Sequence, residues 1–533
     1  MTQFIFHNGT ILTQATPSVI QAVLIENGHI KAVGKLKDVR AKASKTATII
    51  DLKGQTLIPA FNDAHIHIWK VGDLLTYMLD LRGVDSVAEM LEKIADFAAK
   101  NPNNAWILAR GFNETRFADG QMPTRFDLDT ILKDRPCYVI RTCAHVAVLN
   151  SYAMTLCNIT EQTPVPKGGE IRRTSSSSAP TPLDKIGTLS GILTETALGL
   201  AQRHLPKYTP QAYRTMILAA QKAFLKQGIT AATDPAVMPD LLDVYKKMDA
   251  DGELKVRINA IPIVVPDGAI AALPLPKLYK SDYLTVNAVK FFADGGLSGK
   301  TAAMKTPYNN SNDYGVLRLD YDFFKPLARA AQDAGFKIAT HAIGDKTIEM
   351  VMKVYNDISP YNKTGIKHRI EHLGLPSADD LLLMRELGVQ CVTQPIFLYE
   401  LGQNFRQYLP PQYLARVYPY RSVLAAGIDL AFSSDAPVVK NFNPLMGIEN
   451  AVNRQDMTGQ IIGETEKITA AQALKAFTLG AATANNDEHR LGSIEVGKCA
   501  DLVVLDNNPL LEGINIADIK VTQVWVNGHL ILQ

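Results

Sequence analysis

The middle of this chain alternates short apolar segments with stretches of helical periodicity, and this alternation restricts the fold more than any other feature of the sequence. A parallel pair of strands needs a long crossover, usually a helix, so strands that alternate with helices indicate a parallel sheet. Repeated units of this kind predict an α/β protein whose main domain is a (β/α)8 TIM barrel. The segments predicted as its eight strands are 57–62, 228–234, 255–264, 285–292, 336–341, 366–372, 388–394 and 428–433.

The two ends of the chain have a different pattern. Residues 4–58 consist of short apolar runs separated by Asn-Gly and Lys-Gly pairs, which is typical of strands joined by tight turns. The segment from residue 500 onward repeats this pattern. Because chain termini often lie close together, we predict a small composite β-sandwich built from residues 1–57 and 490–533, with the barrel domain at 58–489.

A long insertion interrupts the predicted barrel after its first strand. Residues from about 69 to 210 are too many for an ordinary connection, and they include a polar run at 174–178. They also contain a ninth strand-like segment, 137–140, which we assign to the insertion. Because loops at the carboxyl ends of barrel strands carry function, this segment is predicted to form a lid subdomain over the barrel mouth.

Charge and hydropathy limit the partners. The chain has 55 Lys and Arg residues against 53 Asp and Glu residues, so it offers no broad basic field, and nucleic acid is not an expected partner. No run of roughly 18 uncharged apolar residues exists, and no basic head precedes an apolar run at the N-terminus, so neither a membrane span nor a signal peptide is expected. The five cysteines show no paired ligand spacing and suit a reducing, cytoplasmic location. The sequence leaves open whether the chain forms a homo-oligomer.

Histidines at the ends of predicted strands are the strongest functional pattern. His65 and His67 follow the first strand, and side chains two residues apart in an extended chain point the same way, so both can reach one metal ion. By itself this pair is a weak signal, and two hydrogen-bonded histidines are the more ordinary explanation. However, His341 and His372 end the fifth and sixth strands, and Asp435 follows the eighth. Since catalytic groups of barrels converge at the carboxyl ends of the strands, these residues together predict a metal centre.

A lysine lies in the fourth predicted strand. Lys290 is flanked by apolar residues, and burying a lone ammonium group is unfavourable. One explanation is an ion pair with Asp294. The other is a neutral amine that has captured carbon dioxide, because the resulting carbamate would supply an oxygen ligand to each of two metal ions.

These residues and several further motifs resemble the amidohydrolase superfamily, in particular the amidohydrolase family 3 branch that includes N-substituted formamide deformylases. The resemblance covers nearly every segment of the chain. The matching motifs are Asp63-Ala64-His65-Ile66-His67, Val289-Lys290, Asp294-Gly295-Gly296, Thr340-His341-Ala342-Ile343-Gly344-Asp345, Arg369-Ile370-Glu371-His372, Ser433-Ser434-Asp435-Ala436-Pro437, Gly492-Ser493-Ile494 and Gly497-Lys498-Cys499-Ala500-Asp501.

The resemblance implies a small-molecule hydrolase with one or two divalent metal ions, zinc being the expected metal. His65 and His67 would bind one ion, and His341 and His372 would bind the other. Lys290, if carboxylated at Nζ, would bridge them.

The same resemblance makes Asp435 both a metal ligand and the catalytic proton-transfer group. It implies attack of a metal-bound hydroxide on a carbon–nitrogen bond other than a peptide bond, in an amide or an N-substituted formamide. A bound metal lowers the pKa of water towards neutrality and polarises a carbonyl, which fits this chemistry. Asp435 would take a proton from the water and deliver it to the leaving nitrogen.

Two further residues are candidates for substrate binding. His145 resembles a histidine of the same branch that faces the substrate, although an internal hydrogen bond within the lid is equally compatible with the sequence. Gln394 ends the seventh strand, where its amide could face the bound carbonyl or hold a loop in place.

Two other functions compete with amide hydrolysis. An aminohydrolase that removes ammonia from a heterocycle would typically lack the fourth-strand lysine and carry His-x-Gly-Glu, whereas Ala342-Ile343-Gly344-Asp345 follows His341 here. A non-catalytic relative would use the barrel as a scaffold, but such proteins usually lose ligands, and every expected ligand is present.

Overall fold

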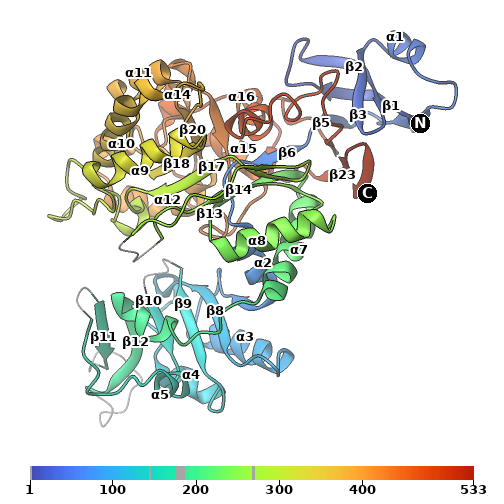
Figure 1. Ribbon diagram of the computed structural model, residues 1–533. Helices are drawn as coiled ribbons and strands as arrows, with labels where there is room; N and C mark the ends of the chain where they lie inside the picture. Colours follow the sequence, from blue (N-terminus) through green and yellow to red (C-terminus); the bar gives the residue numbers. More distant parts are fainter. Residues whose placement is uncertain (1–2, 143–145, 167–168, 175–186, 267–270, 533) are drawn as a thin grey trace. The chain divides into compact units, whose positions relative to one another are not determined.

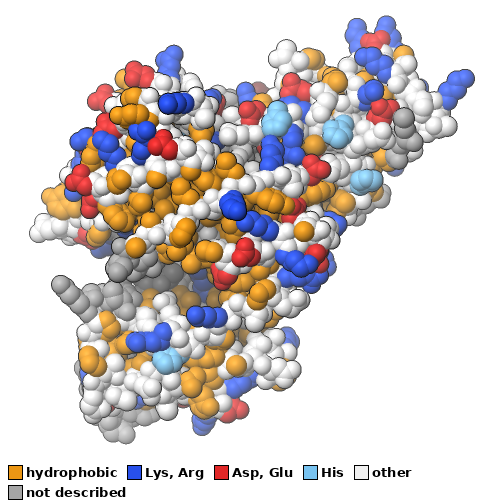
Figure 2. All heavy atoms as spheres, in the orientation of Figure 1, with side chains coloured by type: hydrophobic (Ala, Val, Ile, Leu, Met, Phe, Trp, Pro, Cys, Tyr) orange, Lys and Arg blue, Asp and Glu red, His pale blue; other side chains and the backbone are white. Residues whose placement is uncertain are grey.

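The computed structural model describes residues 3–142, 146–166, 169–174, 187–266 and 271–532 (Figure 1). The chain forms two compact units, one built from residues 1–68 and 220–533 and the other from residues 69–219. Within the described residues, no helix is long and apolar enough to cross a membrane. On the face seen in Figure 2, basic and acidic side chains are interspersed.

Two five-stranded sheets form the centre of the first unit. The first has the order β15-β16-β14-β13-β6, in which β6, β13, β14 and β16 run parallel and β15 is antiparallel to β16. In the second, β17, β18, β19, β20 and β21 are all parallel and adjacent in sequence order. The strands are β6 (Phe61–Asp63), β13 (Ile229–Val237), β14 (Arg257–Pro262), β15 (Tyr279–Lys280), β16 (Leu284–Val286), β17 (Ala288–Phe292), β18 (Lys337–Ala342), β19 (Arg369–His372), β20 (Gln390–Thr393) and β21 (Leu430–Phe432).

Backbone contacts join these two sheets at two places. A parallel bridge pairs Ile263, just after β14, with Lys290 of β17. On the other side, the N–H of Ala64, just after β6, donates to the carbonyl of Phe432 in β21 at 3.3 Å. Parallel strands end at the same edge of a sheet. Because the two sheets are joined, one region of the first unit receives the carboxyl ends of β6, β18, β19 and β21.

Each predicted barrel segment contains a strand, but two of the segments are divided in the structure. The segment 57–62 splits at Pro59, which has no N–H to continue a ladder; β5 ends there and β6 begins at Phe61 in another sheet. The segment 285–292 splits at Asn287, whose amide donates to the carbonyl of Asn485 at 3.0 Å. Consequently β16 and β17 belong to different sheets.

Helices follow most of these strands along the chain. Helices α9, α10 and α11 lie next to one another, and α9 and α10 pack against β18 (Figure 1). Helix α11 is capped by Ser377, whose hydroxyl accepts from the N–H of Asp380 at 3.1 Å. The helices are α7 (Pro210–Lys226), α8 (Pro239–Ala250), α9 (Tyr321–Asp333), α10 (Asp345–Ile358), α11 (Ala378–Leu387), α12 (Ile396–Tyr408), α13 (Pro411–Leu414), α14 (Tyr420–Ala425), α15 (Pro444–Asn453), α16 (Ala470–Lys475) and α17 (Ala481–Ala484).

Strands from both ends of the chain form one eight-stranded sheet. Its order is β24-β23-β22-β5-β1-β2-β3, with β4 beside β1, and β22 pairs antiparallel with β5. One face buries an apolar cluster around Phe6, Leu57 and Trp525, and the other packs under helix α1 (Leu36–Ala41). The strands are β1 (Gln3–Leu12), β2 (Val19–Glu26), β3 (His29–Gly34), β4 (Thr48–Asp51), β5 (Thr56–Pro59), β22 (Leu502–Leu505), β23 (Val521–Val526) and β24 (His529–Leu532).

The second unit has a sheet and a core of its own. The sheet has the order β11-β12-β10-β9-β8-β7, and the strand-like segment 137–140 is β9 within it. Apolar clusters cover both faces, one around Met90 and Ile107 and the other around Tyr138 and Leu149. The elements are α2 (Ile68–Thr76), β7 (Met78–Asp80), α3 (Val87–Lys100), β8 (Ile107–Phe112), α4 (Arg125–Ile131), β9 (Cys137–Arg141), β10 (Val146–Leu149), α5 (Ser151–Leu156), β11 (Gly169–Arg173), β12 (Leu189–Glu195) and α6 (Gly199–Gln202).

Candidate metal centre

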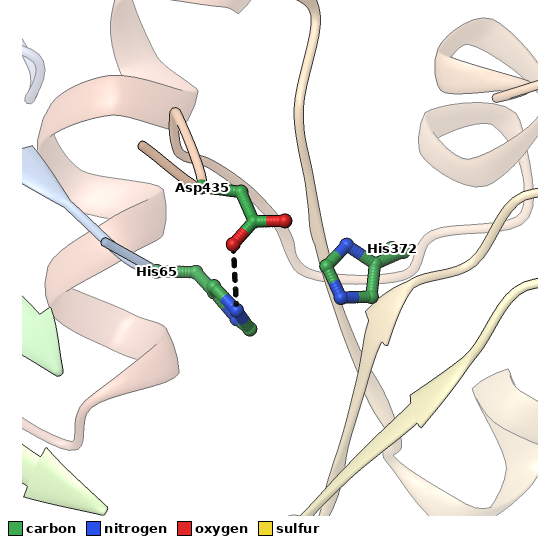
Figure 3. Close-up of side chains that lie close together, drawn as sticks. All are labelled: His65, His372 and Asp435. Atoms are coloured by element: carbon green, nitrogen blue, oxygen red, sulfur yellow. Dashed lines mark ion pairs between the residues drawn. The ribbon is translucent and has the colours of Figure 1, made fainter. Parts of the chain in front are cut away.

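Three predicted ligands meet at the carboxyl ends of the parallel strands. His65 follows β6, His372 ends β19 and Asp435 follows β21, and one ligand atom from each lies within 4.8 Å of the others. Figure 3 shows the three side chains directed towards one another. All three are buried, with residue exposures of 1%, 2% and 5%. This cluster combines residues that are far apart in the chain.

Asp435 contacts both histidines of the first motif. Its Oδ1 lies 3.4 Å from Nε2 of His65 and 3.3 Å from Nε2 of His67. The backbone holds this arrangement, because the N–H of Asp435 donates to the carbonyl of His65 at 2.8 Å and the N–H of His67 donates to that of Ala436 at 2.9 Å. Asp435 has a φ of +57°, a left-handed conformation that Asp adopts more readily than most residues. The two loops therefore present their side chains to a common space.

His341 and His372 lie side by side, with ring centroids 4.4 Å apart. Nε2 of His341 is 3.1 Å from the carbonyl oxygen of Gly295 and donates to it. Nδ1 of His372 is 2.8 Å from Oε1 of Gln394, and Nε2 of Gln394 donates to the hydroxyl of Ser433 at 2.9 Å. These bonds leave Nδ1 of His341 and Nε2 of His372 as the ring nitrogens that can act as ligands.

Lys290 is buried at the site. Its side chain is fully buried in β17, and Nζ makes no hydrogen bond within the part of the chain that the structure describes. Burial lowers the pKa of Lys290 to about 8. Asp294, the partner considered from the sequence, instead accepts from the N–H groups of Ala303, Ile343 and Gly344. The ion pair considered for Lys290 and Asp294 is therefore absent from the described residues.

The protonation states of His341, His372 and Asp435 suit metal binding, whereas Asp435 and Glu371 raise the pKa of His65, which must lose a proton to bind a metal. Burial lowers the pKa of His372 to about 3 and, together with the neighbouring His372, holds the pKa of His341 well below its usual value. Burial would raise the pKa of Asp435, but His65 and His67 outweigh it and keep that pKa well below the usual range. Neutral imidazoles and an ionised carboxylate are the forms that bind metals.

The residues present fit a divalent metal ion. Imidazole nitrogens and a carboxylate oxygen are ordinary zinc ligands. His65, His372 and Asp435 provide three such atoms around one space, and His67 and His341 adjoin it through Asp435 and His372. The buried Nζ of Lys290 provides a sixth group, whose lack of a hydrogen bond within the described residues is relieved if it becomes a ligand as a carbamate.

The structure describes only one of the two predicted substrate-binding residues. His145 lies outside the described residues. Gln394 is fully buried, and both ends of its amide contact other side chains, so the structure gives it the role of orienting His372. Its contact with a substrate stays a prediction.

The structure adds two residues to which the sequence assigned no role. Glu371 contacts Nδ1 of His65 at 2.5 Å. Asp63 accepts from the N–H groups of His65 and Ser434, and burial raises its pKa to about 7. Glu371 and Asp63 lie within recognised motifs and could have been noticed there.

The sequence matches the model of the amidohydrolase family over residues 48–532. This match covers most of the chain, and the chain therefore belongs to the amidohydrolase family. The family resemblance noted in the sequence is confirmed. Membership of this family of metal-dependent hydrolases agrees with the cluster of His65, His372 and Asp435.

Known proteins of similar length resemble the whole chain. Protein LONG AFTER FAR-RED 3 of Arabidopsis thaliana is 28% identical over 98% of this chain and 90% of its own length. The N-substituted formamide deformylase of Arthrobacter pascens is 27% identical, over 97% of this chain and 95% of its own length. The crystal structure of an uncharacterized metal-dependent hydrolase from Pyrococcus horikoshii OT3 is 24% identical, covers 97% of this chain and 99% of its own, and shares the fold with a TM-score of 0.78.

Proposed function

We propose that this protein hydrolyses a carbon–nitrogen bond other than a peptide bond in a small molecule, with an amide or an N-substituted formamide as substrate. The observation that carries the proposal is the convergence of His65, His372 and Asp435, with His67 and His341 beside them. The deformylase name of the Arthrobacter pascens relative supports the formamide class.

The metal ion proposed for this cluster is zinc. When bound, a divalent ion lowers the pKa of water and polarises a carbonyl group. Asp435 is placed to handle the proton, because its carboxylate is buried, ionised and directed into the cluster (Figure 3). Its carboxylate accepts a proton from the attacking water and donates it to the leaving nitrogen, as a positioned acid–base group does. The histidines of the cluster would hold the metal ion.

Lys290 is proposed as a ligand in its carboxylated form. An ammonium group beside a divalent cation is strongly unfavourable in a buried site, so Lys290 must lose its positive charge when the metal binds. Attack of the neutral amine on carbon dioxide forms an N–C bond, releases a proton and leaves an anionic carbamate. Such a group can bridge two ions, so the proposal includes a two-metal centre.

The proposal also includes the architecture expected from the sequence. The two five-stranded sheets, joined at Ile263–Lys290 and at Ala64–Phe432, support closure into a (β/α)8 barrel. The composite β-sandwich is proposed to be formed by the eight-stranded sheet, which contains strands from both chain ends. Unit 69–219 is proposed as the inserted subdomain, with the lid function assigned to it from the sequence.

The test combines metal content with turnover. We expect the purified protein to contain at least one equivalent of zinc by elemental analysis. A panel of N-substituted formamides, acyl amino acids and cyclic amides is then assayed with and without a chelator. We expect hydrolysis of at least one member, loss of activity with the chelator and recovery on adding zinc. Stoichiometric zinc without hydrolysis of any member would contradict the proposed substrate class, and absence of zinc would contradict the metal centre.

A further inference from the structure

We propose that Glu371 is a positioning residue of the metal centre: it fixes the ring of His65, and Arg369 and Asn485 in turn fix Glu371. The inference rests on the proposed metal site and adds residues that act through His65. It is carried by a continuous set of buried contacts beneath the ligand cluster.

The contact between Glu371 and His65 determines which ring nitrogen is available. Oε2 of Glu371 lies 2.5 Å from Nδ1 of His65, and the two side chains are 0% and 2% exposed. A carboxylate only accepts hydrogen bonds, so Nδ1 carries the proton and donates. The lone pair of a neutral ring then lies on Nε2, which is the nitrogen 3.4 Å from Asp435. Glu371 thus selects the tautomer in which His65 can serve as a ligand.

Arg369 holds both the carboxylate and the backbone next to the histidine. Its Nε and Nη2 atoms donate to the two carboxylate oxygens of Glu371. Nη2 also donates to the carbonyl of Ala64 at 2.8 Å. Because Arg369 and Glu371 are two residues apart in β19, their side chains share one face of the strand. The guanidinium group of Arg369 therefore fixes both Glu371, which contacts His65, and the peptide group that precedes His65.

Asn485 anchors the far side of this guanidinium group. Its Oδ1 accepts from Nη1 of Arg369 at 3.0 Å and from Nδ2 of Asn259 at 2.9 Å. Its Nδ2 donates to the hydroxyl of Thr233 at 2.9 Å. These contacts connect β13, β14 and β19 with the segment after α17. Since every nitrogen of the guanidinium group is engaged, Arg369 and Glu371 have little freedom to move.

Stability alone gives a poor reason for this ion pair. Replacing a buried pair by apolar residues of similar volume is often neutral or stabilising, so burial of Arg369 and Glu371 points to another role. The chain holds a second buried pair for comparison. Arg257 contacts both carboxylate oxygens of Asp501 at 2.8 and 3.1 Å, and in the part of the chain that the structure describes this carboxylate accepts from Arg257 and Asn527 but from no histidine. Asp501 is therefore a matched control for Glu371.

The experiment measures zinc affinity of the full chain by competition with a chromogenic chelator. For Glu371→Gln we expect affinity to fall about 10–100-fold, the usual effect of removing a group that orients a ligand. For Asp501→Asn we expect a loss of thermal stability with wild-type zinc affinity. Wild-type affinity in Glu371→Gln, or an equal fall in Asp501→Asn, would overturn the inference.

A second measurement needs no variant. In zinc-loaded wild-type protein labelled with 15N-histidine, the inference expects the proton of His65 on Nδ1. A proton on Nε2 would overturn it even if Glu371→Gln failed to fold. If the wild-type protein bound no zinc, the proposed metal centre itself would be contradicted. If the wild-type protein bound zinc but this binding did not depend on Glu371, only the positioning role would be contradicted.

Discussion

Nε2 of His67 lies 3.3 Å from Oδ1 of Asp435, so the residues that follow β6 and β21, the first and last strands of the two five-stranded sheets, meet directly. This contact places the proposed proton carrier beside a proposed ligand. For Asp435→Asn we expect the turnover number to fall by about 10²–10⁴-fold, because an amide cannot take up the proton. The measurement is kcat at saturating zinc, with bound metal determined in the same sample.

The matched control is Asp456→Asn, since Asp456 is also a buried carboxylate, paired with Arg406 at 2.8 Å away from the cluster. Near wild-type turnover is expected for this control. Retention of most turnover in Asp435→Asn with zinc still bound would show that another group moves the proton.

Two buried histidines of the sixth predicted strand segment should differ in their effect on metal binding. His372 belongs to the cluster, whereas His368 contacts Gln332 at 2.9 Å and the N–H of Ile338 at 3.2 Å. We expect His372→Ala to lose most bound zinc, because it removes a ligand. His368→Ala should keep its zinc and lose thermal stability, because it leaves buried polar groups unpaired. Elemental analysis together with thermal unfolding separates the two, and equal zinc content in both variants would contradict the site.

Lys290 and Lys337 are both buried, and burial lowers their pKa values to about 8 and about 7. Lys337 donates to Gln390, Asn486 and the carbonyl of Ala484, whereas Lys290 makes no hydrogen bond within the described residues. In the metal-free protein we therefore expect opposite effects on the free energy of unfolding at pH 7. Lys290→Met should stabilise by about 1–3 kcal/mol, because the cost of burying the ammonium group exceeds the attraction of Glu371 and Asp435, and that net cost is removed. Lys337→Met should destabilise, because three acceptors lose their donor.

The effect of Lys290→Met should depend on pH. The pKa of Lys290 in the folded protein lies below the usual 10.5. As pH falls from about 10.5 to about 8, the unfolded chain takes up a proton that the folded protein does not, and the free energy of unfolding falls. Below pH 8 both states are protonated and the penalty is constant. Urea unfolding of chelator-treated protein should show a stabilisation that is full near pH 7 and shrinks towards pH 10. A stabilisation that grows with pH would contradict this assignment.

Asp73 gives the second unit a pH dependence of the opposite kind. The residue is 5% exposed, burial raises its pKa to about 6, and its carboxylate accepts from the hydroxyl of Tyr208 at 2.8 Å. Because the folded pKa lies above the usual value, stability falls as pH rises from about 4 to about 6 and is constant above that. Asp73→Asn keeps an acceptor for Tyr208 and should stabilise by about 1–3 kcal/mol at pH 7. Thermal unfolding of both proteins at pH 4 and pH 7 tests this, and a difference that persists at pH 4 would refute it.

Much of the fold was predictable because its signals are local. Apolar strands that alternate with helical segments mark the parallel strands, and each predicted segment contains one. The predicted bounds of the strands were less accurate at Pro59 and Asn287, where the chain passes from one sheet to another. Such a change depends on which partner strand offers its backbone groups, and a single sequence does not contain that information.

The sequence by itself determined that His65, His67, His341, His372 and Asp435 lie at the ends of strands, since this follows from their positions relative to apolar segments. Only the tertiary structure decided that Glu371 supports His65, that Asp294 binds backbone N–H groups rather than Lys290, and that Gln394 orients His372. The physical reason is that hydrogen-bond geometry between distant segments depends on differences of an ångström in strand register and loop path. Residue type and spacing along the chain do not specify those differences.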